Sequence, residues 1–496
     1  MEFPYSSSLV FVPLAGMIAV MLIPKQNVNT IRWTSFLVSV FPMVVSIWLT
    51  WDYFFSHAGS LGMAYVEGPY DWIPSLHIQY YLGVDGISVP MLFLTGLLTT
   101  LSLLASFNIE NRVKEYFAFF LLLEAGMMGV FVALDFFLFY VFWEIMLVPM
   151  YFLIGVWGGP RKEYAAIKFF LYTLFGSIFM LVAILILYFT SDPHTLNMMT
   201  LLDIGPTLSH TLQMVCFIFF FIAFAIKVPV WPFHTWLPDA HVEAPTAVSV
   251  ILAGVLLKMG TYAMLRISWP MFPNALRSLS FWIAILGAIA IIYGALVCMA
   301  QKDLKKLVAY SSVSHMGYCM LALGAFSSVT AITGCMFQMV SHGLITGALF
   351  LLVGVLYDRA HTREIAAFGG LGAQIPVYSG IMVLFAMASL GLPGMSGFVS
   401  EFMVFVGAFG ALNKVLVGIC VLGVVLGATY ILRMVQRIFL GELDLSRWGG
   451  LTEINFREIV TVAPLAVLTI AIGVYPKPLA MLMNATLENL VMLMAR

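Results

Sequence analysis

Long apolar segments, separated by short polar loops, recur along almost the whole of this chain. A helix needs about 20 mostly apolar residues to cross the hydrocarbon core of a bilayer. Hydrophobic residues make up 62% of the chain and charged residues 9%, so the sequence predicts an all-α polytopic membrane protein surrounded by lipid. The fourteen predicted spans are 6–23, 33–54, 84–107, 115–133, 135–157, 163–189, 211–238, 244–267, 279–300, 305–325, 330–356, 376–411, 413–440 and 459–482.

The basic residues support this count of spans and suggest an orientation. If both termini lie outside, sixteen Lys and Arg residues lie in or beside the inner loops and five in or beside the outer loops. Positive charge concentrates on the cytoplasmic side of bacterial membranes. We therefore expect a multi-pass protein of the bacterial inner (cell) membrane with both termini on the periplasmic side. The opening MEFPYSSS has no basic region, so the first segment is expected to be a retained span.

Helix-breaking residues interrupt two of the spans. Pro229 and Pro232 follow a lysine in the seventh span, and Pro393 and Gly394 lie within SLGLPGMSGF in the twelfth. Proline removes an amide donor and clashes with the preceding turn. In lipid, unwound backbone persists only where it is buried in protein or faces a wet cavity.

The two interrupted spans lie five apart, which suggests a repeat. Residues 115–267 (spans four to eight) and 268–440 (spans nine to thirteen) then each have a broken fourth helix. Because five is odd, the second repeat must be inverted, as in many transporters. Residues 1–114 hold the three N-terminal spans, and 441–496 hold the last loop, span fourteen and the tail.

Ionisable side chains recur at similar depth within these spans. A charged group near the bilayer centre costs at least about 2.5 kcal/mol, so it usually pairs, faces water or works. A hydrogen bond between helices is the structural alternative for any one of them. Six together favour proton transfer, because Glu, Lys and His exchange protons when burial and partners change. They are Glu144, Lys227, Lys258, His315, His342 and Glu401.

Other polar side chains are secondary candidates. Glu124 is either a second acid of the path or an acid satisfied in the core, and Lys168 either feeds the path or reaches the inner surface. His234 and His241 follow the first break and are either site contacts or loop histidines. Asp135 is expected to cap the fifth span.

Several chemistries have no signature in the sequence. The five cysteines lie in apolar segments without CxxC spacing, so no iron–sulfur, zinc or other metal site is indicated. No Gly-rich nucleotide loop follows a strand, and no basic stripe for nucleic acid is present. Any redox or nucleotide chemistry must belong to a partner.

Five stretches resemble a known family. They are FLFYVFWEIMLVPMYFLIGVWGG (137–159), KVPVWPFHTWLPDAHVEAPTAVSVILAGVLLKMGTYAMLR (227–266), KDLKKLVAYSSVSHMG (302–317), SHGLITGALFLLVGVLYDRAHTRE (341–364) and SLGLPGMSGFVSEFMV (389–404). They are similar to the antiporter-like subunits of proton-pumping NADH:quinone oxidoreductase, respiratory complex I. Glu401, where L- and N-type subunits usually carry lysine, points to the M-type, the mitochondrial ND-four type.

The resemblance implies a role for each residue. Glu144 and Lys227 would be a gating pair, Lys258 the central relay and Glu401 the exit-side group, with His315 and His342 between them. Quinone reduction elsewhere in the complex would drive one proton across per cycle. FMN, iron–sulfur clusters and quinone would belong to partner subunits, and the L-type and N-type chains would be neighbours in the bilayer. This chain would be a translocase subunit without a redox or NADH site.

Four alternatives remain open from the sequence. The same motifs occur in the D-type subunit of multisubunit cation/proton antiporters and in the homologous chain of a membrane-bound hydrogenase. A passive scaffold with a disused ion path is a third alternative. An independent organic-solute transporter is the fourth, although no substrate-sized polar set accompanies the breaks.

Overall fold

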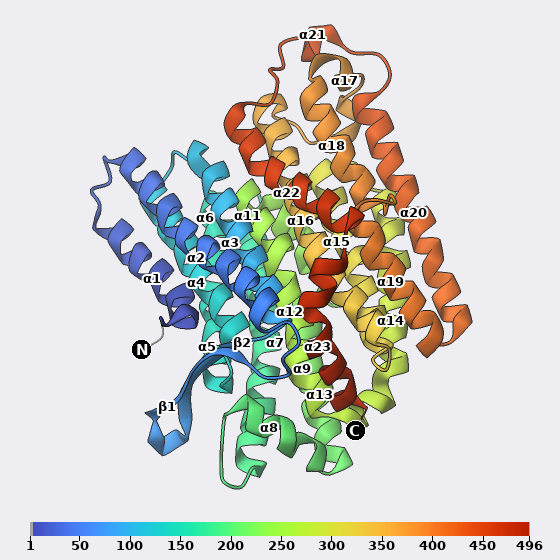
Figure 1. Ribbon diagram of the computed structural model, residues 1–496. Helices are drawn as coiled ribbons and strands as arrows, with labels where there is room; N and C mark the ends of the chain where they lie inside the picture. Colours follow the sequence, from blue (N-terminus) through green and yellow to red (C-terminus); the bar gives the residue numbers. More distant parts are fainter. Residues whose placement is uncertain (1–2, 496) are drawn as a thin grey trace. The chain divides into compact units, whose positions relative to one another are not determined.

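The computed structural model describes residues 3–495 and is built almost wholly from helices (Figure 1). Within these residues, twelve helices are long and apolar enough to cross a membrane. Helix α15 (Leu304–Gly324) matches the tenth predicted span, and α18 (Pro376–Ser389) with α19 (Ser396–Ala411) matches the interrupted twelfth. The predicted all-α polytopic fold with about fourteen spans is confirmed.

The described chain forms two compact units. The first contains the residues up to Val228, then Val255–Phe281, then the residues from Pro478 on. The second contains Pro229–Gly254 and Trp282–Lys477. The chain therefore changes unit in the proline-rich break after Lys227 and again in the π-helical turn that follows Ile251. Compactness says nothing about internal symmetry, so the inverted repeats stay a prediction.

In the first unit, α1 lies along α4, α2 along α3, and α9 along α7 and α12. Glycines let α4 approach the next helix closely: a Cβ at Gly129 would overlap the ring of Phe142. The helices are α1 (Tyr5–Leu22), α2 (Val28–Ser56), α3 (Ser88–Ala105), α4 (Val113–Val132), α5 (Phe136–Ile145), α6 (Leu147–Trp157), α7 (Lys162–Thr190), α8 (Met198–Ile204), α9 (His210–Lys227), α12 (Leu257–Ala263), α13 (Trp269–Met271) and α23 (Lys477–Met494).

Hydropathy did not predict a hairpin in this unit. Strands β1 (Ala64–Ile73) and β2 (Ile78–Val84) follow α2 and precede α3 in the chain, and they pair antiparallel (Figure 1). The carboxylate of Glu67 accepts the backbone N–H groups of Ser6, at 2.7 Å, and Ser7, at 3.2 Å. These are unsatisfied amides of the first turn of α1, so the hairpin caps that helix.

The last predicted span, 459–482, is too long at its C-terminal end. Helix α22 (Phe456–Val474) ends before Tyr475, and α23 begins at Lys477. Hydropathy merged the two because the residues that separate them are few and partly apolar.

The second unit is arranged around α16 (Val329–Ala360), which is buried from Ala331 to Leu356 and contacts α11, α15, α19 and α22. Its other helices are α10 (Trp236–Glu243), α11 (Thr246–Ile251), most of α14 (Pro273–Met299), α15, α17 (Leu371–Gln374), α18, α19, α20 (Lys414–Phe439), α21 (Leu445–Trp448) and α22.

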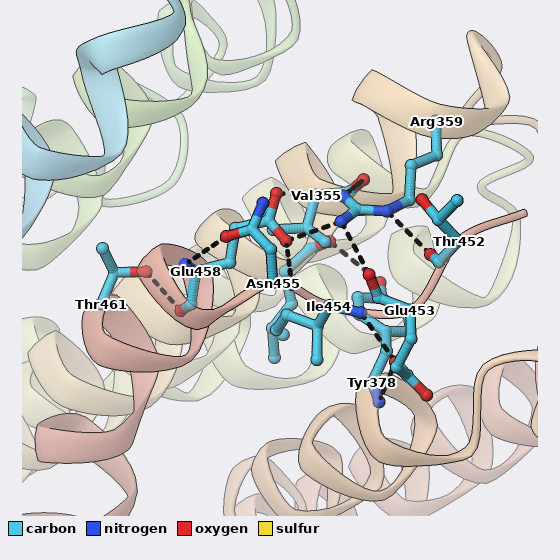
Figure 2. Close-up of polar contacts among 10 residues, drawn as sticks. Val355, Arg359, Tyr378, Thr452, Glu453, Ile454, Asn455, Glu458 and Thr461 are labelled. Atoms are coloured by element: carbon cyan, nitrogen blue, oxygen red, sulfur yellow. Dashed lines mark hydrogen bonds and ion pairs between the residues drawn. The ribbon is translucent and has the colours of Figure 1, made fainter.

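Arg359, near the end of α16, holds three helices of this unit together (Figure 2). Its guanidinium donates to both carboxylate oxygens of Glu458 in α22, at 3.0 and 2.7 Å, and to the carbonyl of Thr452 at 2.9 Å. The neighbouring Glu453 carboxylate accepts the N–H groups of Val377 and Tyr378 in the first turn of α18. This bidentate ion pair and helix cap fix the N-terminal half of the second broken helix.

Candidate functional site

Glu144 is the penultimate residue of α5, next to an interruption of the fifth span at Met146. Helix α5 ends at Ile145 and α6 begins at Leu147. In a continuous helix, residue 149 would donate to the carbonyl of Ile145, but Pro149 has no N–H to give. Asp135 opens α5 and accepts the N–H groups of Phe137, at 2.8 Å, and Leu138, at 3.3 Å, so the predicted N-cap is present.

Lys227 is the last residue of α9 and is buried. Its Nζ lies 5.1 Å from the ring centroid of Trp143, the neighbour of Glu144 in sequence. The charges of Lys227 and Glu144 interact electrostatically, while Nζ has no hydrogen-bond acceptor among residues 3–495. The structure thus brings the predicted pair together with the lysine over an aromatic face, a contact that favours its charged form.

Lys258 is buried in α12, between two π-helical turns, Leu252–Leu256 and Met264–Ser268. Single π turns recur at functional sites. Helix α12 packs closely on the end of α9, since a Cβ at Gly260 would lie 2.7 Å from the carbonyl oxygen of Phe224. The helix that carries Lys258 therefore packs against the turn that carries Lys227.

His315, in the second unit, contacts two groups through its ring. Nδ1 lies 3.1 Å from Oε1 of Glu401, and Nε2 lies 3.2 Å from Oγ of Ser389. Glu401 belongs to α19 and Ser389 is the last residue of α18, so the imidazole contacts both halves of the broken helix. One nitrogen can accept a proton while the other releases one.

A small cavity of about 10 Å³, barely enough for one water molecule, lies beside this histidine. His342 lines it as well, with its ring centroid 5.7 Å from that of His315. The break between α18 and α19 has positive φ at Gly391 (83°) and Gly394 (89°), a conformation that glycine adopts without strain. A Cβ at Gly391 would lie 3.2 Å from the Glu401 carboxylate, so glycine also gives that carboxylate room.

The secondary candidates divide between the two units. In the first, Glu124 is fully buried without a hydrogen-bond partner among the described residues, and the Lys168 Nζ lies 5.6 Å from the ring centroid of Tyr164. In the second, His241 stacks on Phe350 at 4.5 Å, and His234 lies 5.1 Å from the Tyr293 ring. These contacts place the histidines in the packed core of the second unit.

Two polar residues that contact His315 in this cavity are not marked by the sequence pattern. Gln338 lines it, donates to the carbonyl of His315 at 3.3 Å and accepts from the hydroxyl of Ser400. The hydroxyl of Ser389 lies 3.2 Å from Nε2 of the same histidine. Gln338 lies one helical turn before His342, and Ser389 lies at the edge of the break, so their positions relative to those features were the available signal.

The described residues contain no group of three or more His, Cys, Asp or Glu side chains placed to hold a metal ion. Instead, the geometry provides two sets of proton-exchanging groups, all buried except Glu144, which is half-buried. Glu144, Lys227 and Lys258 lie in the first unit, and His315, His342 and Glu401 lie in the second.

Two family models match the chain. One, described as the transmembrane region of NADH:quinone oxidoreductase and Mrp antiporters, matches residues 133–427. The other, described as the amino terminus of NADH-ubiquinone oxidoreductase chain 4, matches residues 68–134. Together they cover the segments that hold all six primary candidates.

Full-length relatives and a solved structure agree with these matches. NADH-quinone oxidoreductase subunit M of Rhodobacter capsulatus is 44% identical over 501 residues, covering 98% of this chain and 96% of the relative. The subunit of the same name from Rickettsia prowazekii is 40% identical, with 99% of both chains covered. A chain of respiratory complex I from Thermus thermophilus with bound NADH superposes with a TM-score of 0.88 at 30% identity, over 99% of each chain.

Proposed function

The chain belongs to the family of transmembrane subunits shared by NADH:quinone oxidoreductase and Mrp antiporters, and from this premise we propose the proton path described below. It is a membrane subunit of a proton-translocating NADH:quinone oxidoreductase, and the redox reaction takes place elsewhere in that complex. The observation that carries the path is the burial of Lys227 within electrostatic reach of Glu144, at the end of a broken helix.

Glu144 and Lys227 form the gate. While the carboxylate is near, its charge stabilises the protonated amine, because burial alone disfavours a lone cation. Movement of the carboxylate away from Lys227 removes this stabilisation, and the lysine releases its proton toward Lys258. Each charge moved against 100 mV takes about 2.3 kcal/mol, which quinone reduction in partner subunits must provide.

His315, His342 and Glu401 form the second half of the path. The two imidazoles line one cavity, and His315 contacts the Glu401 carboxylate directly. A proton received by His342 passes to His315 and then to Glu401, the exit-side group. Glu124, Lys168, His234 and His241 are supporting groups whose loss slows the path without abolishing it.

The remaining features of the proposal concern the assembly. FMN, iron–sulfur clusters and quinone are carried by partner subunits, and the adjoining membrane chains are of the L-type and N-type. The protein lies in the bacterial cell membrane with both termini on the periplasmic side. Residues 115–267 and 268–440 are inverted repeats that place the two broken helices at corresponding positions.

Glu144→Gln in inverted native membranes tests the gate. NADH-driven quinone reduction and lumen acidification are followed together, and Glu163→Gln, an exposed acid of α7, is the matched control. We expect acidification per quinone reduced to fall in the first variant and to stay unchanged in the second. An unchanged ratio in assembled Glu144→Gln enzyme would falsify the gating role.

Cation-driven proton exchange in the same membranes addresses the antiporter alternative. If the NADH-driven activities survive Glu144→Gln while cation exchange disappears, the path serves an antiporter. Loss of acidification with intact cation exchange supports the proposal.

A further inference from the structure

A second buried charged cluster in the first unit has no role in this path. Nη2 of Arg266 lies 2.5 Å from Oδ1 of Asp85 and 3.2 Å from Oγ of Ser88, while Nε donates to the hydroxyl of Tyr262 at 3.3 Å. That hydroxyl lies 2.9 Å from Ser88 Oγ and donates to the carbonyl of Phe131 at 3.1 Å. Arg266 and Asp85 are each only 4% exposed.

The backbone of α3 and the last helix hold the carboxylate of this cluster in place. Oδ1 of Asp85 also accepts the N–H groups of Ile87 and Ser88, both at 3.1 Å. The backbone N–H of Gly86, the residue after Asp85, donates to the hydroxyl oxygen of Thr486 in α23 at 3.1 Å. A Cβ at Gly86 would lie 2.7 Å from the carbonyl of Leu482, so α23 covers the turn that carries Asp85.

Arg266 follows the proposed relay along one helical segment. Lys258, Tyr262 and Arg266 are four residues apart, the spacing that places side chains on neighbouring turns of one face. At a rise of 1.5 Å per residue, the backbone of Arg266 lies about 12 Å along the helix axis from that of Lys258. Residues 247–271 are all buried. Tyr262 lies midway between the two cations on this face, so its hydroxyl is a polar group that separates Lys258 from Arg266.

A guanidinium is unsuited to passing protons. It has five N–H donors and no acceptor, and it stays charged at any pH a protein meets. A chain of hydroxyl groups that carries protons must therefore end where it meets Arg266. A fixed buried cation also repels an approaching proton, as arginine does in water channels that exclude protons.

We propose that Arg266, held by Asp85, is an electrostatic plug. It closes the first unit between Lys258 and the membrane face at which α13 ends, and a proton on Lys258 cannot leave by that route. This inference rests on the proposed role of Lys258 as a proton carrier. It adds a device that prevents back-leakage and so keeps transport coupled to quinone reduction.

The test measures passive proton entry in proteoliposomes that contain the assembled complex, without NADH. Asp85→Asn with Arg266→Met removes both charges, so no buried charge is left unpaired. We expect proton influx under an imposed pH gradient, read by a lumenal dye, to rise at least tenfold. Arg266→Lys keeps a cation and should stay tight, as should Arg277→Met, a matched change at an exposed arginine.

Adding Lys258→Met to the charge-free pair should abolish the leak, because the route then lacks its carrier. A tight charge-free variant, or a leak that survives Lys258→Met, overturns the plug. A drop in NADH-driven pumping without any leak also overturns it, since the cluster would then conduct protons. If the complex with Asp85→Asn and Arg266→Met fails to assemble, Asp85→Leu with Arg266→Met provides the same test with an apolar replacement for the aspartate.

Failure of the plug is separable from failure of the gate. Passive influx does not require turnover, so Glu144→Gln proteoliposomes should be as tight as wild type even where pumping is lost.

Discussion

Replacing Arg359 by methionine should free the loop that precedes α22 and leave the proton-transfer residues in place. The wild-type guanidinium makes two charged hydrogen bonds to Glu458 and one to each of the carbonyls of Val355, Thr452 and Glu453. The arginine and glutamate side chains are only 14% and 11% exposed. Removing one partner of a buried pair costs about 3–5 kcal/mol. Because water reaches part of this pair, the lower value, about 3 kcal/mol, applies.

This free energy sets how often the loop opens. At about 1.4 kcal/mol per factor of ten, loss of about 3 kcal/mol raises the open population roughly 100-fold. Proteolysis reports that population when reclosing is faster than cleavage. Proteinase K should therefore cut the solubilised complex between residues 441 and 455 roughly 100-fold faster in Arg359→Met than in wild type.

Arg447→Met is the matched control, because Arg447 is exposed in the same loop and its guanidinium lies 5.7 Å from the ring centroid of Trp448. Its exposed cation–π contact contributes about 0.5 kcal/mol, so cleavage should rise less than about threefold. Glu458→Gln should resemble Arg359→Met, and the double variant should be no worse than either alone. Additive effects, or an Arg359→Met loop as resistant to proteolysis as wild type, would refute the role of the Arg359–Glu458 ion pair in holding this loop.

Three further substitutions test one close contact between helices and two helix caps. Gly129→Ala places a methyl group where the ring of Phe142 lies and should destabilise the packing of α4 against α5 by about 1–3 kcal/mol, measured as a lower thermal midpoint. The control is Gly418→Ala, which has open space around it and should be neutral or slightly stabilising. Asp135→Ala removes the N-cap of α5 and should cost about 1 kcal/mol, measured by hydrogen exchange in the first turn; unchanged protection there contradicts the capping role. Glu67→Ala uncaps α1 and should speed proteolysis of the hairpin about fivefold, and equal rates would show that the hairpin is held by other contacts.

Lipid made much of the fold predictable. A bilayer requires about 20 apolar residues per crossing, so span positions can be read from hydropathy alone. Proline and glycine likewise marked both broken helices, because their backbone restrictions are local. Hydropathy could not predict the hairpin, since Glu67 and its neighbours lie in a polar loop whose pairing depends on the adjacent helix.

The site was predictable only where a charge was unusual for its surroundings. Glu144, Lys227 and Lys258 stood out because lipid penalises them. Ser389 and Gln338 carry no such penalty, so only the fold shows that they surround His315. Arg266 is one of the five basic residues that the sequence assigns to the outer loops and their flanks, because its partner Asp85 lies 181 positions away.

The docking of α23 on Gly86 has a consequence for synthesis. The amide and the threonine hydroxyl that meet there are 400 residues apart, and at about 5–20 residues per second the second emerges roughly 20–80 s after the first. The first unit is therefore completed last. During that interval α23 does not yet cover the turn that carries Asp85. The proposed barrier to protons at Arg266 and Asp85 can therefore form fully only after α23 has been translated.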